Sequence, residues 1–198
     1  MSRGTNQKFK FTYLMRVMLE KTDDDHALTM SQIMDELEKY DVTAERKSIY
    51  ADFADMTEKE AYRRYFECIL ESICIFDGYD IFGHIDYIVR YGPNKNKYYS
   101  YKDHDGVLDE ILRQLIKRGK GTEINTAGYR KLGNEPNPSS EILKRYRELG
   151  GEIITVGSDA HSPGSVAYDF DRAEALLKEL GYGYYCIFKD RKPEFIRL

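Results

Sequence analysis

Short apolar runs rich in β-branched residues alternate with amphipathic helical segments through residues 57–198. The apolar runs predict strands at 79–84, 121–125, 153–156 and 184–188. A strand that returns to its sheet through a helical crossover usually runs parallel to the strand before it. The alternation therefore predicts an α/β fold built on a parallel sheet.

Capping signals and apolar faces mark the helices of this region. Thr57, with Glu60 three residues later, forms a capping box that begins a long helix. Three further helices are expected: over 107–118, from the turn at 136–140 up to Gly150, and over 171–180.

The first 56 residues predict three short helices instead. Apolar spacing places the first over 8–21, and Thr29 with Gln32 forms a capping box for the second. Thr43 is a candidate N-cap for the third, and three helices in this rhythm suggest a helix-turn-helix. The candidate DNA contacts on the third helix are Arg46, Lys47, Ser48 and Tyr50.

Residues 28–37 and 45–50 resemble the winged-helix head of bacterial transcription regulators that carry a WYL domain. The resemblance implies DNA binding, although the β-hairpin wing expected after the third helix is not recognisable. A solvated helical bundle is the alternative interpretation of the same residues. We therefore predict a helix-turn-helix-like segment over 1–56 and an α/β region over 57–198.

Composition and charge narrow the class of protein. Hydrophobic residues make up 41% and charged residues 32%, and the formal net charge is −4, so no overall basic field indicates nucleic acid. The three cysteines form no Cys-x-x-Cys pair and read as reduced thiols. No apolar run approaches the roughly 20 residues that cross a bilayer, and the start of the sequence is polar. We expect a cytoplasmic protein with no membrane partner.

Four side chains that can bind metal fall in or just beyond three successive predicted strands. His84 ends the first, Glu123 lies in the second, and Asp159 and His161 follow the third. Residues two apart in an extended segment point to the same side, so Asp159 and His161 can reach one ion. Parallel strand ends meet at one edge, where all four would converge. Imidazole nitrogen with carboxylate oxygen suits Zn, Mn or Fe(II).

Each of these residues has a plainer interpretation when taken singly. His84 could be a core histidine, and Asp159 could cap a turn beside a surface histidine. Glu123 could pair with Lys120 or Arg130. Their joint position at successive strand ends favours a metal site.

Three segments, Gly83–Ile88, Thr122–Lys131 and Gly157–His161, resemble in order the motifs of histidinol-phosphatases of the PHP (polymerase and histidinol phosphatase) family. The resemblance implies a distorted seven-stranded βα barrel with a cluster of three metal ions. It also implies hydrolysis of L-histidinol phosphate, a step of histidine biosynthesis.

By the same resemblance His84, Glu123, Asp159 and His161 would be metal ligands for Zn, Mn or Fe, with Asp159 and His161 catalytic. Arg130 would anchor the substrate phosphate, because its planar fork can pair with phosphate oxygens. The bound ions would acidify a water and hold the phosphate. The family's His-x-His on a first strand does not occur in this sequence, so the ligand set is incomplete.

Residues 57–198 are fewer than the roughly 250 of a complete βα barrel. We therefore expect the C-terminal part of an incomplete PHP-type (β/α)7 barrel, with an open edge that favours self-association. Three interpretations stay open: a metal-dependent phosphatase whose activity in this chain is uncertain, a DNA-binding regulator with a non-catalytic barrel remnant, and a fusion or assembly artefact that does not fold stably. Whether the joint near residue 56 is natural stays open too.

Overall fold

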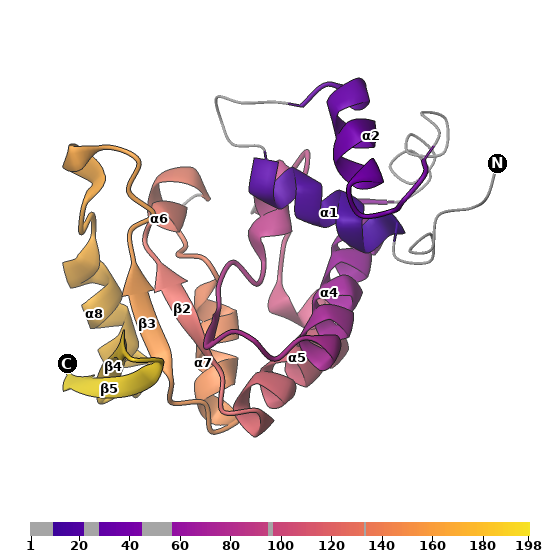
Figure 1. Cartoon of the computed structure of the whole chain (residues 1–198). Coiled ribbons are helices and arrows are strands. Elements are labelled where there is room, and N and C mark those ends of the chain that lie inside the picture. The colour runs from indigo at the N-terminus through magenta and orange to yellow at the C-terminus, as the bar shows by residue number, and fades with distance from the viewer. Residues whose placement is uncertain (1–9, 22–27, 45–56, 95–96, 133) are drawn as a thin grey trace. The chain divides into compact units, whose positions relative to one another are not determined.

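The computed structural model describes residues 10–21, 28–44, 57–94, 97–132 and 134–198 (Figure 1). The chain divides into two compact units, residues 1–68 and 69–198. Across the described ranges, no helix is both long enough and apolar enough to span a membrane.

The first unit has a small apolar core shared by α1 (Lys10–Lys21) and α2 (Met30–Glu38). The capping box predicted at Thr29 is confirmed, because its side chain accepts a hydrogen bond from the backbone of Gln32 and the Gln32 side chain accepts one from the backbone of Thr29. The third predicted helix and its candidate DNA contacts, Arg46, Lys47, Ser48 and Tyr50, lie outside the described residues. The core consists of Leu14, Val17, Ile33, Leu37, Val42 and Ala44.

Helix α4 (Glu58–Ile75) begins at the second predicted capping box. Glu60 Oε2 accepts from the backbone of Thr57 at 2.8 Å, and Thr57 Oγ1 accepts from the backbone of Glu60 at 3.3 Å. Both acidic residues of the first turn also favour the positive end of the helix dipole. The predicted apolar face is largely confirmed, with Tyr62, Tyr65, Phe66, Ile69 and Ile73 buried.

A parallel sheet forms the centre of the second unit. Its strands are β1 (Ile81–Phe82), β2 (Gly121–Asn125) and β3 (Ile154–Gly157), in that order. Figure 1 shows β2 and β3 side by side. The mixed α/β class and the parallel pairing are therefore confirmed. Among the residues that the structure describes the sheet is open, and the strands do not close into a barrel.

The helices of this unit bury the apolar faces that the sequence predicted. They are α5 (Asp105–Lys117), α7 (Ser140–Glu148) and α8 (Phe170–Glu179), together with the unexpected short helix α6 (Ala127–Lys131). Tyr146 lies under the sheet with its hydroxyl 3.3 Å from the carbonyl oxygens that precede β2 and β3. The fully buried side chains include Leu108, Ile111, Leu112, Leu115, Ile124, Ile142, Leu143, Ile154 and Leu177.

The fourth predicted strand forms as β4 (Tyr184–Lys189), but it does not extend the parallel sheet. It contacts β3 and makes its hydrogen-bonded ladder with β5 (Lys192–Arg197), in an antiparallel hairpin. The two turn residues, Asp190 and Arg191, both have left-handed backbones, with φ of 49° and 62°. This geometry matches the twist of a two-residue hairpin. No signal in the sequence indicated β5, because the turn lacks the usual glycine and Pro193 is a residue that disfavours a strand.

Candidate functional site

The ends of β1, β2 and β3 enclose the carboxylate of Glu123. A Cβ atom on Gly83, just after β1, would lie 2.5 Å from Glu123 Oε1. A Cβ atom on Gly157, at the end of β3, would lie 3.4 Å from Oε2. The glycines on the two flanking strands therefore leave the space that the carboxylate occupies.

His84 turns toward this carboxylate. Its backbone is left-handed, with φ of 59°, and its Nδ1 lies 2.9 Å from Glu123 Oε1. The ring stacks on Tyr87 at 4.8 Å between centroids. Burial acts to lower the pKa of His84, but the hydrogen bond and charge of Glu123, with smaller contributions from Asp159 and Asn137, outweigh it, so the pKa is raised. The Glu123 carboxylate thus favours the protonated imidazole.

Asp159 and His161 form a second pair after β3. Asp159 has a left-handed backbone, with φ of 47°, and its Oδ1 lies 3.6 Å from His161 Nε2. His161 is 74% exposed, whereas Asp159 helps to line the pocket that also contains His84. His84 therefore contacts Glu123 and shares a pocket with Asp159, whereas His161 lies farther out, so the four predicted ligands are not seen to converge on one point.

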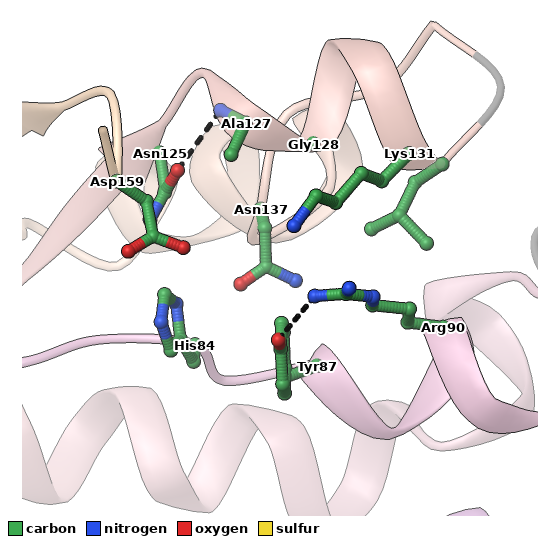
Figure 2. Close-up of a pocket in the computed structure, with 10 residues that line it drawn as sticks. His84, Tyr87, Arg90, Asn125, Ala127, Gly128, Lys131, Asn137 and Asp159 are labelled. Atoms are coloured by element: carbon green, nitrogen blue, oxygen red, sulfur yellow. Dashed lines mark hydrogen bonds between the residues drawn. The ribbon is translucent and has the colours of Figure 1, made fainter. Parts of the chain in front are cut away.

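The pocket at this edge contains two cationic side chains as well (Figure 2). The Lys131 amine and the Arg90 guanidinium both point toward Asn137. Arg90 is only 8% exposed and donates to the Tyr87 hydroxyl. A site with two cations beside a carboxylate and an imidazole can hold an anionic ligand. Its lining residues are His84, Tyr87, Arg90, Asn125, Ala127, Gly128, Lys131, Leu132, Asn137 and Asp159.

Arg130, the predicted phosphate anchor, is exposed and lies beside the loop that follows β3. Its guanidinium lies 4.6 Å from the centroid of the Tyr168 ring, and its Nη2 donates to the Ser158 carbonyl at 3.4 Å. The structure thus places Arg130 next to Asp159 but outside the pocket lining, where Lys131 lies instead.

Sequence reasoning missed Arg90, Lys131 and Asn137. Lys131 ends the second motif, and Arg90 follows the first motif by two residues, so the motif positions themselves were an available signal. Asn137 had no such signal. Two backbone hydrogen bonds with Asn125, of 2.8 and 3.0 Å, bring it to the pocket, and this contact between separate segments leaves no local pattern in the sequence. Gly128 permits this approach, since a Cβ there would lie 2.5 Å from the carbonyl carbon of Pro136.

The four predicted ligands are of the chemical types that bind a divalent cation, but too few of them lie close together to complete a coordination shell. Imidazole nitrogen and carboxylate oxygen are ligands that zinc takes in proteins. They lie as two pairs, His84 with Glu123 and Asp159 with His161. Within the described ranges no three His, Cys, Asp or Glu side chains gather closely enough to hold a metal. These residues would supply part of a coordination shell and leave positions open.

Comparison with known proteins relates the chain to a known family. Residues 13–127 match the PHP domain. The match runs through residue 56 and overlaps the segment interpreted as a helix-turn-helix, and the comparisons give that interpretation no support.

Two curated relatives share the same description. A histidinol-phosphatase of Lactococcus lactis is 33% identical over 138 residues, which are 68% of this chain and 50% of the relative. A probable histidinol-phosphatase of Clostridium acetobutylicum is 30% identical over 154 residues, 78% of this chain and 57% of the relative. The chain spans about half the length of the curated relatives it matches.

A solved structure agrees with these matches. It is the crystal structure of histidinol phosphate phosphatase from Lactococcus lactis with zinc, L-histidinol and phosphate. The TM-score is 0.59 at 30% identity, and the match covers 72% of this chain and 54% of that one. With more than half of its sequence matched by the family and a solved member of similar fold, the chain belongs to the PHP domain family.

Proposed function

We propose that the strand-end pocket is the hydrolytic site of a phosphoric monoester hydrolase that acts on L-histidinol phosphate, in histidine biosynthesis. The central observation is that His84, just after β1, pairs with Glu123 of β2 and shares a pocket with Asp159, just after β3, beside two cations. Membership of the PHP domain family and the names of the relatives support this substrate.

The proposed phosphate site uses the cationic side of the pocket. Arg90 is buried and held by Tyr87, so its guanidinium is already oriented for a phosphate oxygen. Lys131 adds a point charge from α6. Arg130 remains the predicted anchor, and its packing against Tyr168 puts a further cation near Asp159.

The proposed metal side uses His84, Glu123, Asp159 and His161 as ligands for a divalent cation, Zn, Mn or Fe. When bound, such an ion polarises the phosphate and lowers the pKa of a bound water. Glu123 Oε1 lies 2.9 Å from His84 Nδ1, so these two ligands are already close together. Asp159 and His161 are the proposed catalytic pair, in which the carboxylate orients the imidazole next to the pocket. The chemistry needs no protein nucleophile.

Phosphate release tests the proposal. The whole chain is incubated with L-histidinol phosphate and zinc or manganese, and zinc bound per chain is measured by equilibrium dialysis. We expect release that falls at least about 100-fold in Glu123→Gln and in Asp159→Asn, since each loses a ligand. Glu152→Gln is the control, because Glu152 is 68% exposed and pairs with Arg147 away from the pocket. A metal-loaded wild type that releases no phosphate, or a Glu123→Gln variant as active as the control, contradicts the proposal.

Cytoplasmic location and self-association through an open sheet edge stay predictions. Size-exclusion chromatography with light scattering over a range of concentrations tests the second of these.

A further inference from the structure

Asp86 is a carboxylate buried beside the pocket, two residues after His84. It is 3% exposed. Its Oδ1 accepts from Asn137 Nδ2 at 2.7 Å, and its Oδ2 accepts from the backbone N–H of Ser139 at 2.9 Å. Burial raises the pKa of Asp86 to about 6, against the hydrogen bonds from Ser139, which lower it. A fully buried carboxylate is costly, so packing alone does not explain an aspartate at this position.

The hydrogen bond to Asp86 leaves the Asn137 amide one orientation. A carboxylate only accepts hydrogen bonds, so the NH2 group of Asn137 must face Asp86. The amide oxygen must then face the opposite way, and Figure 2 shows it on the side of His84 with the nitrogen turned away. The Asn137 backbone is fixed as well by its paired hydrogen bonds with Asn125.

We propose that Asp86 is a positioning residue that acts through Asn137: by holding the amide nitrogen, it presents Asn137 Oδ1 to His84 and so fixes the imidazole against Glu123. The His84 ring then has the Asn137 amide oxygen near it as a second acceptor besides the Glu123 carboxylate. This geometry stands whether or not the site hydrolyses phosphate. Its effect on catalysis rests on the proposed function.

Nitrogen-15 NMR of the histidine rings tests this arrangement in the whole chain at one fixed neutral pH. The His84 signals are assigned with His84→Asn. In Asp86→Asn the new NH2 group must face either the Asn137 NH2 group or the backbone N–H of Ser139, and two donors cannot pair. We therefore expect the Asn137 amide to turn and the His84 ring signals to move. In the exchanged variant D86N/N137D, the amide introduced at position 86 can accept from Ser139 and donate to the carboxylate introduced at position 137, whose second oxygen faces His84. The signals should then return toward the wild-type positions.

Two further variants separate positioning from stability. Asp109→Asn removes another buried carboxylate, on α5, that has no contact with His84, so it should destabilise the chain and leave the His84 signals unchanged. Asn137→Ala keeps the bond between Asp86 and Ser139 but removes the amide oxygen, so the His84 signals should move even if Asp86→Asn does not fold. Unmoved His84 signals in Asn137→Ala, or in a folded Asp86→Asn, overturn the proposal. So does an exchanged variant that folds without recovering the signals.

Phosphate release adds an independent readout. If the proposed function is right, Asp86→Asn should lower the rate by about 10- to 100-fold, the usual cost of losing a group that orients a ligand, and the exchanged variant should recover part of it. A wild type that releases no phosphate would contradict the proposed function alone, because the ring signals still decide the positioning role.

Discussion

Replacing Asp109 by asparagine should weaken the packing of α5 against α7 and the loop before α5. Asp109 accepts from Arg145 Nε at 2.9 Å and Nη2 at 2.7 Å, in a two-point pair, and from Arg113 at 2.8 Å. The Tyr101 hydroxyl, from the 3-10 turn Tyr101–Asp103, donates to the same carboxylate. Its side chain is only 11% exposed, so water cannot replace these donors fully.

The magnitude follows from the pKa and from the burial of the pair. The Arg145 hydrogen bond is the main cause that lowers the pKa of Asp109 from 3.8 to about 2. A shift of roughly two units is worth about 2–3 kcal/mol at about 1.4 kcal/mol per unit. Removing one partner of a fully buried pair costs about 3–5 kcal/mol, but Arg145 is 32% exposed and can regain water. We therefore expect a loss of about 2 kcal/mol.

The direction of the pKa shift determines how the stabilising contribution of Asp109 changes with pH. Because the folded pKa is lowered, the contribution of Asp109 is fully present above the unfolded value of 3.8 and is lost as the pH falls from about 4 to about 2. Urea unfolding of both proteins, followed by tyrosine fluorescence because the chain has 17 Tyr and no Trp, measures it. The difference between wild type and Asp109→Asn should be largest at neutral pH and shrink in acid.

The matched control is Glu148→Gln. Glu148 pairs with the same arginine at 3.1 Å but is 47% exposed, so its loss should cost less than about 1 kcal/mol. If Asp109→Asn destabilises the chain no more than Glu148→Gln, or by the same amount at every pH, the reasoning from burial is refuted.

Two pairs of glycine substitutions test the close approaches at the site. Gly128→Ala should lower the melting temperature and displace Asn137, because its Cβ would lie 2.5–2.7 Å from backbone atoms of 135–137. Gly106→Ala, in the first turn of α5, would meet nothing within 4 Å and should stabilise the chain by about 0.5–1 kcal/mol. Equal melting temperatures of the two variants would argue against the tight contact at Gly128. Gly83→Ala should weaken zinc binding in equilibrium dialysis, because its Cβ would lie 2.5 Å from the Glu123 carboxylate, and Gly157→Ala, at 3.4 Å, should weaken it less. Equal affinities would contradict the placement of Glu123.

Local signals in the sequence predicted much of the fold. The positions of β2 and β3, helix α7 between them and both capping boxes follow from periodicity and from side chains three residues apart. The contact of His84 with Glu123 and the pocket that His84 shares with Asp159 follow from parallel strand ends sharing an edge. Each of these inferences needs only short-range pattern and one rule of sheet geometry.

Contacts between distant loops could not be predicted in the same way. Asp86 and Asn137 are 51 residues apart, and each alone reads as an ordinary loop residue. The pairing of β4 with β5 also depends on a turn without glycine, in which Asp190 and Arg191 both adopt left-handed backbones. The closure of a barrel requires strands beyond the three that pair in the described sheet.

Anomalous diffraction at the zinc edge, from crystals of the whole chain grown with zinc and phosphate, tests the central claim most directly. The account predicts a zinc peak at the ends of β1, β2 and β3, in contact with at least one of His84, Glu123 and Asp159, with phosphate beside Arg90 or Lys131. Zinc found only at other surface sites, with His84 still bound to Glu123 and the pocket free of phosphate, would contradict it.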